Sequence, residues 1–245
     1  MAASPIFRFV LVPGFWLGAW AWDTVAEQLR GAGHDVAAVT LPGLGSASED
    51  RSSVHMEDHI AAIADALAAA PEPAVLALHS GAGVSGYAAT DRVPHSVAAV
   101  VYVDTGPGTG TPMWASFEGV EYPLPDWPEV VKNGNSLDGL DERALAIFGE
   151  RAVPEPGNVL REGFELTDPA RLRIPTTVLC SSMTVTQAKT WVADGAAFVA
   201  ELANLTGPVE WVDLPTGHWP MWSRPADLAE ELVRAGERAK VGHPS

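Results

Sequence analysis

The sequence predicts an α/β protein with one mostly parallel β-sheet that carries helices on both faces. Short apolar runs of strand length alternate along most of the chain with segments in which apolar residues recur at helical spacing. Several of these runs are apolar at nearly every position, which is typical of strands whose two faces are both covered. This alternation indicates parallel strands that are joined by helical crossovers.

The pattern also places the individual elements along the chain. The helix expected at residues 55–70 has the clearest pattern, because Met56, Ile60, Ile63 and Leu67 recur on one helical face. The last helix is expected to stop near Gly236. The expected strands are residues 7–12, 35–40, 74–78, 97–103, 176–181 and 209–214, and the other expected helices are residues 22–30, 83–90, about 187–204 and 225–234.

The regular alternation breaks between residues 105 and 173. Glycine and proline are frequent in this segment, and its helical patterns, at residues 127–132 and 141–148, are short. In an α/β protein, ligands bind outside the carboxyl ends of the strands, and an insertion of this kind covers that end. We therefore expect one domain over residues 1–245, with a cap insertion at about 105–173.

Composition excludes several classes of function. The chain of 245 residues carries 31 acidic and 15 basic residues, for a net charge of −16, which disfavours binding to nucleic acid and to anionic membrane surfaces. The single cysteine, Cys180, rules out an internal disulfide and falls within an expected strand, as a buried small hydrophobe would. His55 and His59 lie one helical turn apart, and we expect them on a solvated face rather than at a metal. No metal and no cofactor is predicted.

The sequence also predicts a location. No apolar run approaches the length that crosses a membrane, and the first residues lack a basic segment followed by an apolar stretch. The expectation is a cytoplasmic protein whose partner is a small-molecule substrate.

Residues 74–83 carry the strongest functional signal. An apolar run ends at Ser80, and Gly81, Ala82 and Gly83 follow it directly. A sharp turn between a strand and a helix lifts a serine hydroxyl clear of the sheet and points the next backbone N–H at the same space. We interpret Ser80 as a nucleophile; the alternative is a buried serine at the end of a strand.

Several segments, in order, resemble the α/β-hydrolase superfamily. The resemblance is to the branch that contains plant hydroxynitrile lyases, methylesterases of the methyl-salicylate type and their bacterial relatives. The segments are residues 9–22, 33–36, 40–43, 78–83, 101–104 and 217–218. In this superfamily small residues stand two positions before and two after the nucleophilic serine, and here those positions hold Leu78 and Ala82. Leu78 is therefore a departure from the pattern.

The resemblance implies roles for residues outside the turn. His218 matches the histidine that acts as the general base, which a serine needs before it can attack. The backbone N–H groups of Gly81 and of Phe15, which follows Gly14, match the donors of the oxyanion hole. The order serine, acid, histidine requires the acid to lie between residues 81 and 217.

The identity of the acid stays open at this point. In most of the superfamily an aspartate follows the strand expected at 176–181, but this chain has no acidic residue between Asp168 and Asp194. Asp104, after the preceding strand, is the acid we favour, because losing a triad aspartate costs about 10⁴-fold in rate. Alternatively Ser182 or Thr184 holds the histidine without a charge, or catalysis is impaired. Asp104 would then only cap its own loop.

Aromatic residues indicate the substrate. The chain has nine tryptophans, and several fall near the predicted machinery or in the insertion. We expect an apolar pocket for aromatic or alkyl groups, and for the residues of the insertion core packing is an equal alternative. The predicted substrate-binding residues are Gly14, Trp16, Trp114, Trp127 and Trp219.

The sequence thus predicts a serine esterase that acts on a small, neutral, apolar or aromatic ester. A lyase of the hydroxynitrile type is disfavoured, because the resemblance implies a threonine and a lysine where this chain has Gly14 and Trp219. A non-hydrolytic or weakly active protein of the same fold, such as a binder or a cyclase, remains an alternative since the usual aspartate is absent.

Overall fold

The computed structural model describes residues 5–242, and its centre is a six-stranded sheet in which all strands are parallel. The strand order is β2-β1-β3-β4-β7-β8. The strands are β1 (Arg8–Val12), β2 (Asp35–Ala38), β3 (Ala74–His79), β4 (Val97–Val103), β7 (Thr176–Cys180) and β8 (Val209–Asp213). The predicted α/β class is confirmed, and each predicted strand is present within a few residues of its expected bounds.

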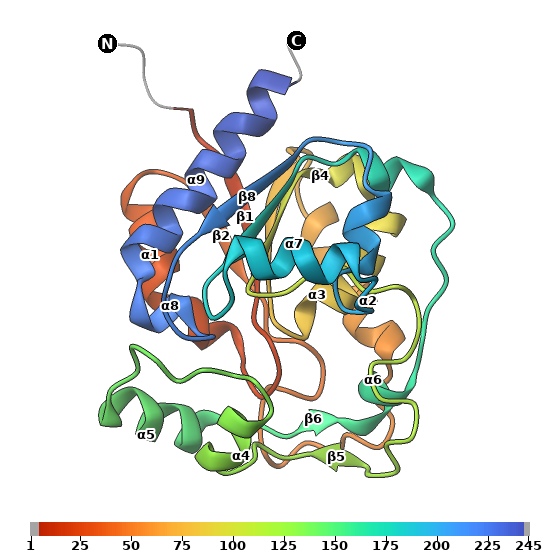
Figure 1. The fold of residues 1–245 in the computed structure, drawn as a ribbon, viewed down its shortest axis with the longest axis vertical. Helices are drawn as coiled ribbons and strands as arrows, with labels where there is room; N and C mark the ends of the chain where they lie inside the picture. Colours follow the sequence, from red (N-terminus) through yellow and green to blue (C-terminus); the bar gives the residue numbers. More distant parts are fainter. Residues whose placement is uncertain (1–4, 243–245) are drawn as a thin grey trace.

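Helices cover both faces of this sheet (Figure 1). Side chains of one strand alternate between the two layers: Phe9 and Leu11 pack in one core, and Val10 and Val12 pack in the other. This double burial explains why the central strands are almost continuously apolar. The helices of the first layer are α1 (Asp23–Gly31), α8 (Pro220–Ser223) and α9 (Pro225–Gly242), and those of the second are α2 (Met56–Ala68), α3 (Ala82–Arg92) and α7 (Val185–Ala193).

Most of the segment between β4 and β7 folds at the end of the molecule that lies away from the chain termini, and its last residues run back along the side of the sheet to β7 (Figure 1). Its elements are β5 (Glu121–Tyr122), α4 (Trp127–Lys132), α5 (Glu142–Arg151), β6 (Glu155–Pro156) and α6 (Gly157–Arg161), and β5 pairs with β6 in antiparallel fashion. Backbone hydrogen bonds join it to two loops of the sheet: Val153 donates to Trp16, and His218 donates to Ser136. We refer to residues 105–173 as the cap segment.

Two helices differ from their predicted bounds. The helix expected at 187–204 is α7, which ends at Ala193, followed by a separate 3₁₀ turn η4 (Ala200–Asn204). Gly195 adopts a φ of 71°, the left-handed conformation that commonly ends a helix. Conversely, α9 continues through Gly236, where a Cβ atom would lie only 2.9 Å from the ring of Phe7. Gly236 therefore permits close packing of α9 and does not end the helix.

The prediction that His55 and His59 share a solvated face is wrong for His59. His55 caps the start of α2, but the His59 side chain is buried, and its Nε2–H donates to the carbonyl of Pro42 at 2.9 Å. His59 lies on the same side of α2 as the buried Met56 and Ile63, which its spacing places one turn away. Residues 5–242 contain no group of three side chains that could hold a metal ion, and no helix among them could cross a membrane.

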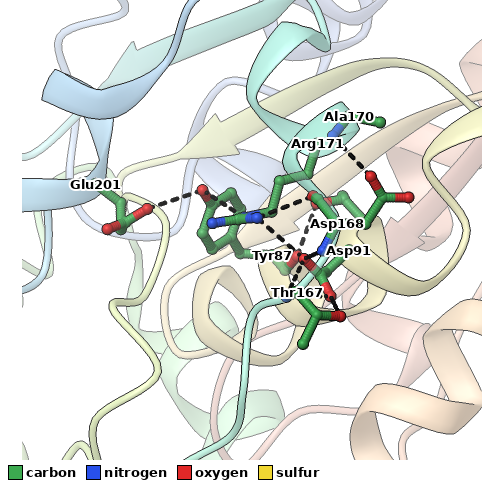
Figure 2. Close-up of polar contacts among 8 residues, drawn as sticks. Tyr87, Asp91, Thr167, Asp168, Ala170, Arg171 and Glu201 are labelled. Carbon is green, nitrogen blue, oxygen red and sulfur yellow. Dashed lines mark hydrogen bonds and ion pairs between the residues drawn. The ribbon is translucent and has the colours of Figure 1, made fainter.

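A polar network fixes the far end of α3, the helix that follows Ser80 (Figure 2). Tyr87 donates its hydroxyl hydrogen to Glu201 of η4 at 2.9 Å. Arg171 of the 3₁₀ turn η3 (Pro169–Arg173) donates its Nε–H to the Tyr87 oxygen at 3.1 Å and one Nη1–H to Asp91 at 3.1 Å. Asp91 also accepts backbone N–H groups of residues 167 and 168. The network ties α3 to the chain on both sides of β7.

Candidate active site

Ser80 lies on the sharp turn between β3 and α3. Its φ of 51° is in the left-handed region, which is costly for a residue with a side chain. The turn is held by the Ser80 N–H, which donates to Val103 at 3.3 Å, and by the Gly83 N–H, which donates to Ser80 at 2.9 Å. A Cβ atom on Gly14 would lie 2.6 Å from the Ser80 Cβ, so only glycine lets the loop after β1 come this close.

The unusual Leu78 is accommodated by a glycine one turn into α3. The Leu78 side chain is fully buried, and a Cβ atom on Gly86 would lie 2.2 Å from its Cδ2 and 2.9 Å from its Cγ. The large residue before the turn is thus matched by a missing side chain on the helix that packs against it. Sequence spacing alone does not reveal this pairing, because it depends on how α3 crosses β3.

We expect Gly86→Ala to destabilise the protein by about 1–3 kcal/mol, the usual effect of adding a methyl group to a filled core. Leu78→Ala alone should cost about 2–5 kcal/mol by opening a cavity. The double variant should be more stable than the sum of the two losses predicts, because the new methyl group fills part of that cavity. Urea unfolding of the four proteins measures this coupling, and strict additivity would contradict the proposed contact.

His218 connects Ser80 to Asp104. Its Nε2 lies 2.8 Å from the Ser80 Oγ, and its Nδ1 lies 2.6 Å from the Asp104 Oδ2. An ionised carboxylate can only accept, so Nδ1 carries the hydrogen and Nε2 is free to accept from the serine hydroxyl. Asp104 and His218 are both buried, with exposed fractions of 4% and 7%. These three side chains form one continuous hydrogen-bonded chain.

Asp104 is held by the loop after β7. Its φ is 53°, and its Oδ1 accepts the backbone N–H groups of Ser181 and Ser182, each at 2.8 Å. The Ser182 hydroxyl donates to Oδ2 at 2.5 Å. Burial raises the pKa of Asp104, but His218 and these serine donors outweigh it and bring the pKa to about 2. Ser182 therefore contacts the carboxylate, whereas Thr184 caps α7 through the Gln187 N–H.

Two backbone N–H groups next to the Ser80 turn have no acceptor among the described residues. The N–H groups of Phe15 and Gly81 donate to no other group within residues 5–242. The two residues are in close contact, because a Cβ atom on Gly81 would lie 2.3 Å from the Phe15 ring. An oxyanion hole needs backbone N–H groups that are free in this way, and Phe15 and Gly81 stay the predicted donors.

His79 is a site residue that the sequence did not single out for a role. Its Nε2–H donates to the His218 carbonyl at 2.8 Å, so its Nδ1 is the acceptor for the Gly14 N–H at 3.2 Å. Burial lowers the pKa of His79 to about 3, so the ring is neutral and keeps this pair of roles. His79 thereby links the loop that carries Phe15 to the loop that carries His218.

Two cavities lie near the candidate site: one borders Asp104 and His218, and the other borders Phe15, and both border Asn133. The larger, of about 690 Å³, is bordered mainly by apolar side chains, and the smaller, of about 340 Å³, is bordered by Asp104 and His218 themselves. Lining the larger cavity are Phe15, Met113, Trp114, Tyr122, Glu129 and Leu160. Lining the smaller are Ser182, Met183, Gln187, Trp191 and Phe198.

The predicted substrate-binding tryptophans are distributed differently. Trp114 borders the larger cavity, and Trp16 lies behind it, buried against the ring of Tyr122. Trp127 and Trp219 border neither cavity, because both pack against the core residue Phe148. Trp219 follows His218 in the sequence and Trp127 lies in the cap segment, but these positions alone do not show whether a side chain lines a cavity or packs in the core.

The fold and this constellation define an α/β-hydrolase. The model of the alpha/beta hydrolase family matches residues 9–231, so the chain belongs to that family, and the resemblance drawn from the sequence is confirmed.

Several known proteins are similar to this chain. Methylesterase 7 of Arabidopsis thaliana is 35% identical over 100 residues, which cover 39% of this chain and 38% of that protein. This chain therefore matches less than half the length of that relative. Carbendazim hydrolyzing esterase of Nocardioides sp. (strain SG-4G) is 27% identical over 247 residues, covering 94% of this chain and 99% of that protein. The solved structure of the Arabidopsis methylesterase MES16 shares the fold, with a TM-score of 0.75 at 18% identity, and covers 95% of this chain and 100% of that one.

Proposed function

We propose that this protein is a serine esterase that hydrolyses small, neutral, apolar or aromatic esters. The observation that carries the proposal is the hydrogen-bonded chain from the Ser80 Oγ through His218 to Asp104, at 2.8 and 2.6 Å. The esterase names of the similar proteins support the same reaction class.

In the proposed reaction the Ser80 oxygen attacks the ester carbonyl carbon while His218 Nε2 takes the serine proton. The negative charge that forms on the carbonyl oxygen is stabilised by the Phe15 and Gly81 N–H groups. Asp104 accepts the Nδ1–H of the protonated His218 ring. The imidazolium then gives its Nε2 proton to the departing alcohol, which leaves an acyl group on Ser80. Water, deprotonated by His218, releases the acid and restores the serine.

The larger cavity supports the proposed substrate class. Its aromatic and aliphatic wall, which includes Trp114, Tyr122 and Leu160, suits a flat or branched apolar group. Glu129 borders the same cavity and disfavours substrates that carry a carboxylate. The net charge of −16 acts in the same direction.

A non-hydrolytic role was an alternative only because no aspartate directly follows β7. Asp104 removes that reason for it. Asp104 lies where it can serve as the acid, and Ser182 completes its contacts. A hydroxynitrile lyase is disfavoured by Gly14 in the loop after β1 and by the buried Trp219.

Ser80→Ala tests the proposal. Turnover of p-nitrophenyl butyrate should fall by about 10⁴-fold or more, and a fluorophosphonate probe should label Ser80 in the parent protein only. Ser96→Ala, which alters a serine before the amino end of β4, whereas Ser80 follows the carboxyl end of β3, is the matched control and should keep full activity. Unchanged turnover in the Ser80 variant, or labelling at another residue, would refute the assignment.

A further inference from the structure

Behind the loop that carries Phe15 lies a buried group of ionisable side chains that the proposed reaction does not use. Glu155 of β6 and His59 of α2 are each 1% exposed, and Arg51 is 3% exposed. The Glu155 Oε1 lies 3.9 Å from the His59 Nδ1. Burying a carboxyl group so completely costs free energy unless it is hydrogen-bonded, so we expect a hydrogen-bond partner for Glu155 nearby.

That contact is with Trp16, the residue after Phe15. Three hydrogen bonds from the cap segment hold it: its backbone N–H donates to Glu155 Oε2 at 3.4 Å, its indole N–H donates to Tyr122 at 3.0 Å, and its carbonyl accepts from Val153 at 2.9 Å. Trp16 has a φ of 66°, an unfavourable conformation that persists only where surrounding contacts impose it. The Trp16 N–H belongs to the peptide group that joins Phe15 to Trp16, so these contacts also fix the backbone at Phe15.

The hydrogen bond from His59 to Pro42 favours one shared proton on the buried pair at neutral pH. His59 uses its Nε2–H to donate to Pro42, so in the neutral ring Nδ1 is an acceptor that faces Glu155. A protonated Glu155 matches this acceptor, whereas an ionised Glu155 would match only a protonated ring. In either arrangement the pair holds one proton and has no net charge.

The remaining charges around the pair are few. Arg51 approaches from the loop before α2, but its guanidinium binds Glu121 at 3.3 Å and the carbonyl oxygens of residues 46, 47 and 49. Asp58, next to His59 on α2, favours the charged form of that ring. From the loop after β1 only the Trp16 N–H reaches the Glu155 carboxyl among the described contacts.

Only a small space separates Glu155 from the predicted oxyanion donors. A cavity of about 10 Å³ is bordered by all four of Glu155, His59, Phe15 and Gly81. A negative charge on Glu155 would therefore lie close to the place where the reaction develops negative charge, in surroundings that screen it poorly.

Resting on the proposed esterase function, we propose that Glu155 is a positioning residue for the oxyanion hole: its neutral carboxyl holds the Trp16 N–H and thereby orients the Phe15 N–H, and its ionisation weakens the hole.

The titration of the two groups agrees with this geometry. Burial raises the pKa of Glu155 to about 8, against the opposing effects of the Trp16 N–H and of Arg51. Burial lowers the pKa of His59 to about 4, although its bond to Pro42 opposes the change. At neutral pH the proton is thus on Glu155, and it is lost as the pH rises through about 8.

Glu155→Gln is the decisive variant, because glutamine reproduces the neutral carboxyl: its oxygen can accept from Trp16 and its amide can donate to His59. We expect kcat for p-nitrophenyl butyrate, corrected for spontaneous hydrolysis, to fall several-fold in the parent protein between about pH 7 and about pH 9.5. The Gln variant should keep its neutral-pH kcat within about threefold and lose this alkaline decline. Glu155→Leu, which cannot hold Trp16, should lower kcat about 10- to 100-fold at every pH, with a smaller change in KM.

Glu162→Gln is the matched control. Glu162 also belongs to the cap segment, accepts a backbone N–H from Met56 at 3.1 Å and contacts a histidine, His55, at 2.7 Å, but it is partly exposed and lies away from Trp16. This variant should retain the alkaline decline. A decline that persists in Glu155→Gln would overturn the inference, as would its loss in Glu162→Gln. If Glu155→Leu does not fold, the pH profile of the Gln variant still decides.

These outcomes are separate from failure of the proposed function. A parent protein that neither hydrolyses esters nor labels at Ser80 would refute the esterase assignment itself. A parent protein that does both, with an alkaline decline that Glu155→Gln leaves unchanged, would refute only the role of Glu155.

Discussion

Replacing Asp104 with asparagine is expected to lower kcat for ester hydrolysis by about 10⁴-fold with little change in KM. Asparagine is nearly the same shape but cannot stabilise the positive charge that His218 acquires. Its amide can also donate to Nδ1, which would place the ring hydrogen on Nε2 and block acceptance of the Ser80 proton. Because the pKa of Asp104 is about 2, the parent carboxylate is ionised at every pH of an ordinary assay, and the loss should be the same throughout.

Steady-state kinetics of Asp104→Asn beside Asp213→Asn measures this effect. Asp213, at the end of β8, accepts the Val185 N–H at 2.8 Å and does not touch His218, so its variant should keep full activity. Near-ultraviolet circular dichroism spectra of the three proteins should coincide, which would show that the fold is unchanged. A loss of less than about tenfold in Asp104→Asn would show that another group orients His218.

The second large effect concerns stability. We expect Arg171→Met to destabilise the fold by about 3 kcal/mol and to lower Tm by about 6–12 °C, because it leaves the buried Asp91 without its cationic partner. The Arg171 Nη1 lies 3.1 Å from Asp91, and the two side chains are only 12% and 7% exposed (Figure 2). The variant also removes the donor to the Tyr87 oxygen. Since none of these groups touches the triad, kcat at temperatures well below Tm should not change.

Arg173→Met provides the comparison, because Arg173 belongs to the same 3₁₀ turn but is exposed. Thermal denaturation followed by circular dichroism should show a Tm close to that of the parent protein for this variant. Equal Tm losses in the two variants would mean that the effect comes from the turn itself and not from the network of Tyr87, Asp91 and Arg171.

The sequence predicts the sheet well because the four central strands, β1, β3, β4 and β7, are buried on both faces, and each therefore reads as a continuous apolar run. The boundaries of two helices were harder, since they depend on single glycines with opposite roles. Gly195 ends a helix through its φ of 71°, whereas Gly236 lies within α9 and makes room for the Phe7 ring. A glycine in a sequence does not say which of these applies until its packing partner is known.

For the candidate site, Ser80 and His218 follow from short local motifs. The contacts that support them do not, because they join distant parts of the chain. Glu155 reaches Trp16 only because β6 pairs with β5 over two residues, a strand too short to give a pattern. Gly86 matters only through Leu78, and Ser182 only through Asp104. The sequence shows the unusual Leu78 and the unusual position of Asp104, but it does not show that Gly86 and Ser182 accommodate them.

Because Asp104 follows β4, the cap segment can vary in length and sequence without moving it. Ser80 and Asp104 follow adjacent, directly paired strands, β3 and β4, so the proposed nucleophile and the proposed acid belong to a single β-α-β unit. The whole cap segment comes after both of them in the chain. Insertions, deletions or grafted loops between residues 105 and 173 can therefore change which molecules are admitted while the spacing of the proposed nucleophile and acid stays constant. Such changes must still preserve the return of His218 and the contacts that Val153 and Glu155 make with Trp16.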